Sequence, residues 1–159
     1  MQIQNLIILN TVSKDDVDKC WEFIRDTIHS INATEYSQSQ LDIWMNKKID
    51  KESWWKMVST HMSYITVFNN EIIGFSEMTA KGKLCCLYVH KDFQDLTIAS
   101  ILLNKLEEDA KKLGINNITT EIGNVAKPLF EILGYRVYQQ QQVILSGIKL
   151  MKLQMIKVI

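Results

Sequence analysis

The chain has 159 residues, of which 47% are hydrophobic and 23% charged, so it can bury the core of one globular domain but not comfortably of two. Its eighteen basic and eighteen acidic residues cancel, which leaves no overall field to attract nucleic acid or an anionic membrane. No stretch approaches the roughly 18 apolar residues of a membrane span, and the N-terminus lacks the basic flank of a secretion signal. We therefore expect a single cytoplasmic domain over residues 1–159, without nucleic-acid or membrane partners.

The first part of the chain predicts a strand followed by helices. Residues 5–12 are rich in β-branched and apolar side chains, which favours a strand. Ser13 then precedes acidic residues, as a helix N-cap does. Apolar residues at three- and four-residue steps predict a helix with one buried face: Val17, Cys20, Trp21, Ile24 and Ile28. Weaker helical patterns follow at residues 38–45 and 52–59.

The middle of the chain predicts an antiparallel meander and then a long helix. Strands are expected at residues 63–68, 71–79 and 84–89. Asn69 and Asn70 separate the first two strands, and this residue type tolerates the positive φ of a tight hairpin turn. The clearest amphipathic helix covers residues 97–113, and Gly114 supplies its stop.

The remaining elements are a strand, a short helix and two strands, at residues 117–122, 125–133, 135–140 and 146–156. Apolar residues occur on both faces of the terminal segment 143–159. This segment fits two alternatives, namely completion of the chain's own sheet or pairing with a second subunit.

The three cysteines show no metal or redox motif. Cys85 and Cys86 are adjacent, without C-x-x-C spacing, and Cys20 is far away in the sequence. We expect reduced, mostly buried thiols and no metal. Because side chains alternate across a strand, one of Cys85 and Cys86 should face the core and the other should approach whatever binds beside the strand.

Residues 87–99 run from a strand through a short turn directly into the long helix. Such a turn gathers backbone N–H groups at the positive end of the helix dipole, where a pyrophosphate binds well. Many α/β proteins contain a strand-turn-helix, so this geometry alone does not identify a ligand.

Four motifs, in order and with matching spacing, resemble those of the GNAT superfamily of N-acetyltransferases. EYS at residues 35–37, with Trp44, is similar to a subgroup of small bacterial members, and EIIGF at residues 71–75 is similar to the family's E-I-V-G-F strand. VHKDFQ at residues 89–94, followed by Ile98 and Ala99, is similar to the CoA-binding motif, in which a Q/R-x-x-G-x-G/A turn follows V-H-P-D-Y. AKPLFE at residues 126–131, followed by Gly134 and Tyr135, resembles the second signature of the family. These matches run from about residue 35 to the C-terminus.

The resemblance implies an α/β (α+β) fold with a mixed, mostly antiparallel sheet of six to seven strands, about four flanking helices and one splayed strand pair. It also implies an enzyme that moves an acetyl group from acetyl-CoA, its co-substrate, to a primary amine by direct attack in a ternary complex. No metal takes part. No acidic cluster marks a site for a polycationic acceptor, so the expected acceptor is a small-molecule or amino-acid-like amine of unknown identity. The terminal segment 143–159 leaves a homodimer open.

The same resemblance implies site residues. The cofactor is expected to contact the splayed strand, the turn with the first helical turn, and the second signature, through Leu87, Tyr88, Val89, Gln94, Asp95, Leu96, Thr97, Ile98, Ala99, Asn124 and Phe130. The Val89 N–H is the expected donor to the thioester carbonyl. Glu77 and Glu121 are alternative general bases, and either can instead be a solvated charge at a strand end. Tyr36 and Trp44 are expected in the wall that binds the acceptor.

Three residues depart from the family pattern. Thr97 replaces the first glycine of the turn, Asp95 stands where basic residues are common, and Phe130 stands where many members have a tyrosine that protonates the thiolate. If the turn requires a positive φ at Thr97, we expect about 1–3 kcal/mol of strain, and Asp95 adds about 0.3–1 kcal/mol of repulsion near a phosphate. These residues favour the alternative function, a catalytically weak or inactive domain that serves as an acyl-CoA sensor or a protein-interaction module.

Overall fold

The computed structural model describes residues 7–31, 50–145 and 147–159. The described elements follow the predicted order: β1 Ile8–Thr11, α1 Val17–Ile31, α3 Lys51–Ser59, β2 Met62–Phe68, β3 Glu71–Met78, β4 Lys83–Val89, α4 Leu96–Lys112, β5 Asn117–Ile122, α5 Lys127–Ile132, β6 Arg136–Leu145 and β7 Ile148–Val158. The helix predicted at residues 38–45 lies outside the described residues. No helix in the described ranges combines the length and the apolar character needed to cross a bilayer.

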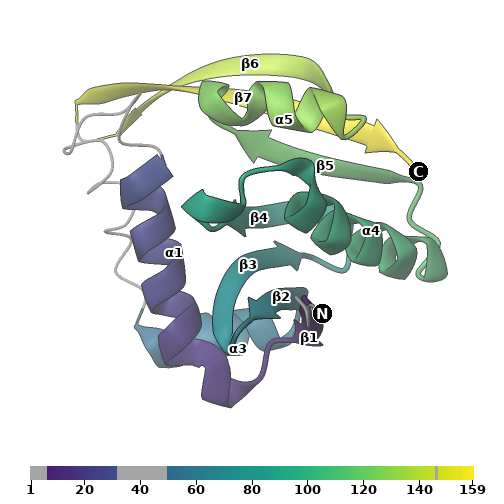
Figure 1. Ribbon diagram of the computed structural model, residues 1–159. Helices are drawn as coiled ribbons and strands as arrows, with labels where there is room; N and C mark the ends of the chain where they lie inside the picture. The colour runs from purple at the N-terminus through teal and green to yellow at the C-terminus, as the bar shows by residue number, and fades with distance from the viewer. Residues whose placement is uncertain (1–6, 32–49, 146) are drawn as a thin grey trace.

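The strands form one seven-stranded sheet in the order β1-β2-β3-β4-β5-β7-β6 (Figure 1). Neighbouring strands are antiparallel except for β4 and β5, which are parallel. This confirms the predicted mixed, mostly antiparallel sheet. Because β7 pairs with both β5 and β6, the C-terminal segment completes the chain's own sheet, which was one of the two alternatives that the sequence left open.

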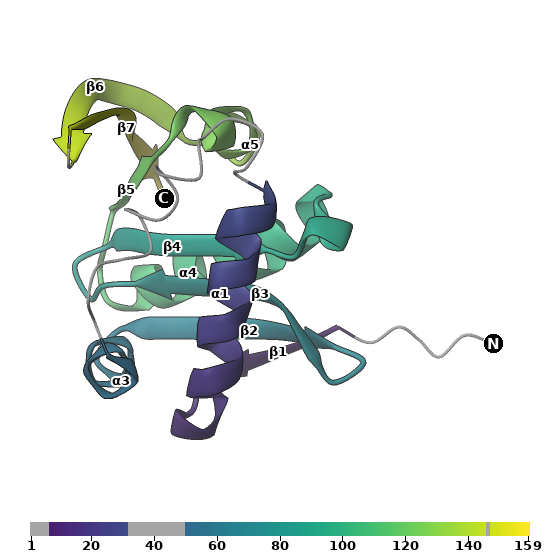
Figure 2. The ribbon, with the colours of Figure 1, turned by 90° about the vertical axis from the view of Figure 1, so that its left-hand side faces the viewer.

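Helices cover both faces of the sheet. Figure 2 shows α1 crossing the near face and α4 lying behind the sheet. On the first face, α1 and α3 pack on β2 and β3 through Phe23, Trp54 and Phe75 among others. On the second face, α4 and α5 share a core cluster that includes Leu106 and Phe130.

Short polar residues start and end the elements as predicted. Asn69 and Asn70 have φ values of 50° and 64° and form the hairpin between β2 and β3. Before α1, the backbone N–H of Ser13 donates to the Asp16 carboxylate at 2.8 Å, which closes the first turn as a capping residue does. The hairpin turn is therefore set by the positive φ of two asparagines, and the start of the first helical segment is set by a local hydrogen bond.

Gly74 allows α4 to pack closely on β3. A Cβ at this position would lie 2.8 Å from Cγ2 of Ile98 and 2.9 Å from Cδ1 of Leu102, which is closer than van der Waals contact. Gly74 also pairs with Val89, the last residue of β4. The missing side chain therefore lets the first turn of α4 lie beside the end of β4.

Candidate active site

The hydrogen-bond pattern of β4 directs two backbone N–H groups away from β3. Val89 pairs with Gly74, and the His90 N–H donates to the Ile73 carbonyl at 2.8 Å. In an antiparallel ladder this makes Gly74 and Val89 a non-hydrogen-bonded pair, whose own N–H and C=O groups point outward. Leu87 lies two residues before Val89 and pairs with Ser76, so its N–H and C=O groups point in the same direction as those of Val89. The N–H groups of Leu87 and Val89 therefore point to the side on which β5 lies.

β5 does not continue beside β4. The two strands pair over two positions, the second of which joins Leu84 to Thr120. At this junction the Thr120 hydroxyl donates to the Leu84 carbonyl at 3.0 Å. Beyond it the strands separate, so β4 and β5 are the splayed pair that the family resemblance implies. The two outward N–H groups come after the junction and face the gap.

A cavity of about 220 Å³ lies at this gap. Its wall is formed by β4, the end of β5, Gln94, the start and body of α5, and one residue of α1. Cys86 and Tyr88 in this wall pack toward α1 and α3, whereas Leu87 and Val89 pack toward α4. Residues that pack on both faces of the sheet therefore line the cavity.

Gln94 joins the end of β4 to the start of α4. Its side-chain Nε2 donates to the carbonyl oxygens of Val89 at 2.5 Å and of His90 at 3.0 Å. Gln94 also lines the cavity. Its amide therefore holds the turn in shape at the place where the sequence predicts a cofactor contact.

The first turn of α4 is capped by a carboxylate. Asp95 is the N-cap, and its Oδ1 accepts a hydrogen bond from the Thr97 N–H at 2.9 Å. One of the donors that a helix start offers to an anion is thus occupied by a negative side chain. The N–H groups of Leu96 and Ile98 are the other donors of this turn. The side chains of Ile98 and Ala99 are buried in the core, so only their backbone groups remain for the cofactor contact that the family resemblance implies.

Thr97 is not strained. Among the described non-glycine residues, a positive φ occurs at Asn69 and Asn70, and Thr97 is a helical residue of α4. The strain expected from the loss of the motif's glycine is therefore wrong, because the helix starts before this position. The departure from the family pattern in this turn is therefore the negative charge of Asp95, which caps the helix.

The second signature brings one of its two predicted residues to the cavity. Phe130 is buried, lines the cavity and packs edge-on against Tyr135, with ring centroids 5.3 Å apart. Asn124 is exposed at the start of a short 3-10 helix (Asn124–Ala126), and its neighbours Gly123 and Val125 line the cavity in its place. The expected contact of Asn124 with the cofactor stays a prediction.

The two predicted bases have different environments. Glu77 in β3 is 1% exposed, and its Oε2 lies 2.6 Å from Nδ1 of His61. Glu121 at the end of β5 lines the cavity and forms an ion pair with Lys152 at 3.0 Å. Glu121 thus belongs to the cavity wall, whereas Glu77 is separated from the cavity by Cys85 and Cys86, which line it.

A β-bulge in β4 gathers both adjacent cysteines around Glu77. The register shifts after the Glu77–Cys86 pair, which leaves Cys85 as the extra residue. Cys86 Sγ lies 3.8 Å from Oε1 of Glu77, and both cysteines line the cavity. Cys86 packs against the core cluster of α1 and α3 and Cys85 is exposed, so one of the two faces the core as expected, although the bulge brings both thiols near Glu77. Burial, followed by the nearby Glu77 charge, raises the pKa of both thiols.

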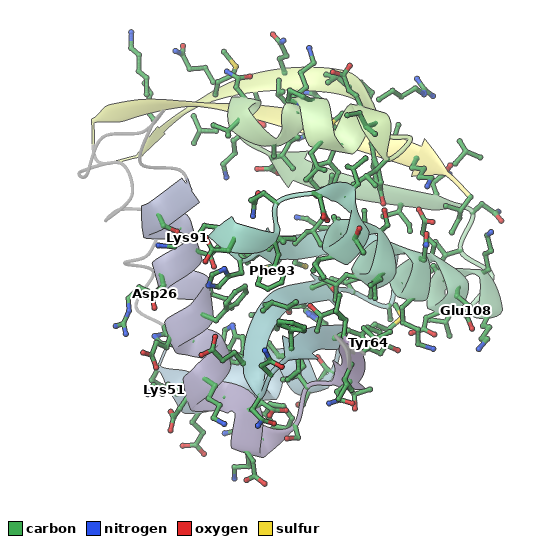
Figure 3. All side chains as sticks on the ribbon, in the orientation of Figure 1. Asp26, Lys51, Tyr64, Lys91, Phe93 and Glu108 are labelled. Atoms are coloured by element: carbon green, nitrogen blue, oxygen red, sulfur yellow. The ribbon has the colours of Figure 1, made fainter. Side chains whose placement is uncertain are left out.

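A second cavity of about 590 Å³ opens between α1 and the β2–β3 hairpin. Asp26 of α1 and Lys91 of the turn after β4 line it, and Figure 3 shows these two side chains on neighbouring segments. Acidic and basic residues are mixed in its wall. Thr27 lines both cavities, so the α1 face offers a route toward the gap.

Sequence reasoning missed Thr27, Thr120 and His61. Thr27 had a signal, since it is a polar residue on the buried face of an amphipathic helix and is 6% exposed. No sequence signal pointed to His61, because it lies in the turn between α3 and β2. Only the pairing of β2 with β3 brings His61 close to Glu77. Tyr36 and Trp44 lie outside the described residues, so the wall that they are expected to form stays a prediction.

Comparison with known proteins places this geometry in a family. A family model described as an acetyltransferase (GNAT) domain matches residues 32–157. YafP of Escherichia coli K12, an uncharacterized N-acetyltransferase, is 26% identical over 145 residues, which cover 91% of this chain and 91% of YafP.

Solved structures show the same fold. A GCN5-related N-acetyltransferase (Aminotransferase, Class-II) from Rhodopseudomonas palustris has a TM-score of 0.88 at 21% identity and covers 100% of this chain and 99% of its own. The PaiA N-acetyltransferase from Thermoplasma acidophilum, in complex with coenzyme A, has a TM-score of 0.80 at 20% identity, with 97% and 99% covered. YncA from Salmonella typhimurium, with acetyl-CoA, has a TM-score of 0.72 at 17% identity, with 96% and 93% covered. Since the family model spans most of the chain, the protein belongs to the GNAT acetyltransferase family.

Proposed function

We propose that this protein transfers the acetyl group of acetyl-CoA to a primary amine by direct attack in a ternary complex. The observation that carries the proposal is the splayed gap, in which the N–H groups of Leu87 and Val89 face outward at the approach to the start of α4. The pantetheine arm of CoA contains amides that can pair with such a strand edge, and its diphosphate suits a helix N-terminus. Relatives that hold CoA and acetyl-CoA support the same ligand here.

The cavity suits the two substrates of this reaction. The amine nitrogen attacks the thioester carbon, the carbon–sulfur bond breaks, CoA leaves as a thiolate, and the nitrogen loses a proton. Charge that develops on the carbonyl oxygen needs a fixed donor, and we assign this role to the Val89 N–H. The thioester approaches from the α4 face, and the amine approaches from the α1 face, where Thr27 joins the two cavities.

We assign the role of general base to Glu121, with Glu77 as the alternative. Ile118 and Ile122 of β5 pack in the α4 and α5 cluster, so Glu121, which lies between them in alternation, faces the α1 side from which the amine comes. Glu121 also lines the cavity. Glu77 is buried and bonded to His61, so it can take a proton only by relay.

Tyr88 is the proposed hydrogen-bond donor that stabilises the leaving thiolate. Phe130 cannot donate, whereas the Tyr88 phenol belongs to a residue that lines the cavity. Burial, with smaller contributions from Cys86 and Glu77, raises the pKa of Tyr88, so its phenol stays protonated at neutral pH. A thiol with an ordinary pKa of about 8.5 also leaves reasonably well as a thiolate, so we expect this donor to accelerate turnover without being essential.

One observation favours the alternative, an acyl-CoA sensor that does not turn over. The Asp95 carboxylate occupies the Thr97 N–H, so a diphosphate must share or displace it. A weakened cofactor site suits a domain that reports acyl-CoA only at high concentration.

Thermal denaturation with acetyl-CoA tests the binding that both functions share. A ligand at a hundred times its Kd stabilises the fold by about 2.7 kcal/mol, and no shift at millimolar acetyl-CoA would contradict both. Release of free thiol across a panel of amines then separates the enzyme from the sensor. Val89→Pro and Val89→Ala form a matched pair, because both remove side-chain packing but only proline removes the N–H. We expect thiol release to be lost in Val89→Pro and retained in Val89→Ala.

A further inference from the structure

We propose that His61, Glu77 and Cys85 form a binding site for a divalent metal ion of the zinc type. Their ligand atoms, an imidazole nitrogen, a carboxylate oxygen and a sulfur, all lie within 4.8 Å of one another. The three residues come from three segments, the turn after α3, the strand β3 and the bulge of β4. Because the bulge turns Cys85 toward Glu77, this convergence depends on the fold and has no counterpart in the spacing of the sequence, which predicted no metal.

The spacing of these atoms suits a tetrahedral ion after a small adjustment. Zinc binds nitrogen and oxygen at about 2.0–2.2 Å and sulfur at about 2.3 Å, which places tetrahedral ligand atoms roughly 3.3–3.8 Å apart. Nδ1 of His61 and Oε2 of Glu77 are now 2.6 Å apart and must separate to admit the ion. The Cys85 side chain is exposed, so it can turn inward toward the other two ligands.

The chemistry of the donors selects the class of ion. Nitrogen, oxygen and sulfur together suit zinc and similar borderline-soft ions, whereas calcium and magnesium prefer oxygen alone. Glu77 is a carboxylate that is 1% exposed, and such a group requires a cationic or hydrogen-bonding partner. The His61 side chain is 19% exposed, which leaves one side open for entry of the ion and for water as a fourth ligand.

A neighbouring thiol holds the carboxylate in place. Cys86 Sγ lies 3.8 Å from Oε1 of Glu77, the oxygen that does not contact His61. Such contacts to the outer atom of a ligand orient it toward the ion. Since Cys85 and Cys86 also line the cavity at the gap, a bound ion would share a wall with the proposed acyl site.

Cobalt(II) binding to the reduced, full-length protein tests the site, because thiolate ligation gives a charge-transfer absorption band. We expect one equivalent to bind, with a band that is removed by competing zinc. Cys85→Ser should abolish the band and weaken binding by more than the roughly 10- to 100-fold that loss of an outer-shell contact costs, and His61→Ala should weaken binding similarly. Cys20→Ala is the matched control, since it removes a thiol that is 0% exposed on the buried face of α1, and it should keep the band.

The folded state of each variant is checked by circular dichroism, which separates loss of ligands from unfolding. Absence of a sulfur charge-transfer band in the native protein would overturn the proposal. Survival of the band in folded Cys85→Ser, or its loss in folded Cys20→Ala, would overturn it as well.

Discussion

Asp95→Asn should strengthen the binding of CoA. In the structure the Asp95 carboxylate accepts a hydrogen bond from the Thr97 N–H at 2.9 Å, at the helix start where the diphosphate is proposed to bind. Asparagine caps a helix about as well as aspartate, so this substitution keeps the hydrogen bond and removes the negative charge. Any change in affinity then reports the charge itself.

The expected gain follows from Coulomb's law. A phosphate oxygen on the neighbouring first-turn N–H groups would lie about 4 Å from the carboxylate, where two unit charges repel by about 1 kcal/mol in water and by about 4 kcal/mol at an effective dielectric constant of 20. Asp95 is exposed, so the value for water applies. At 1.4 kcal/mol per tenfold, 1 kcal/mol is roughly a fivefold decrease in Kd.

Isothermal titration calorimetry with CoA measures this change. The gain should shrink at about 1 M salt, where the Debye length falls from about 10 Å at 0.1 M to about 3 Å. Asp92→Asn is the control, because Asp92 is an exposed carboxylate of the same turn that does not cap α4. Equal or weaker CoA binding by folded Asp95→Asn would refute the reasoning that the carboxylate competes with the diphosphate.

Three further substitutions test other parts of the structure. Thr97→Gly should change the Kd for CoA by no more than about twofold, since Thr97 is helical and unstrained, and a tenfold tightening in calorimetry would show that strain is present after all. Gly74→Ala should lower the free energy of unfolding by about 1–3 kcal/mol, because its Cβ collides with α4; at about 2–4 °C per kcal/mol, an unchanged Tm would contradict this contact. Glu121→Gln should lower kcat by about 100-fold or more without changing the Kd for CoA. If Glu77→Gln shows this loss of kcat and Glu121→Gln does not, the base is Glu77.

Much of the fold was predictable because its signals are local. The stripe from Val17 to Ile28 gave α1, and Asn69 and Asn70 gave the hairpin, since periodicity and turn chemistry depend only on neighbours in the chain. The splayed pair was expected only through the family resemblance. Its physical basis, pairing of β4 with β5 that ends at Leu84, involves contacts between segments 36 residues apart.

The candidate site was predictable at its backbone and less so at its side chains. The Val89 N–H and the turn around Gln94 were expected through the family resemblance. The structure gives the physical reason for Val89, because its pairing with Gly74 directs the N–H away from β3. The bulge at Cys85 depends on the register between two strands, which no single-strand pattern reveals. Thr97 illustrates the opposite error, because the missing glycine suggested a strained turn, whereas Asp95 starts the helix early enough to make the position ordinary.

The central claim is that the edge of β4 and the first turn of α4 together bind CoA. Titration of isotope-labelled protein with CoA, followed by amide NMR spectra, tests it most directly. The account predicts saturable shifts at the amides of Leu87, Val89, Leu96 and Ile98, with one common Kd. Unchanged amides at these positions with millimolar CoA, or saturable shifts confined to another part of the chain, would contradict it.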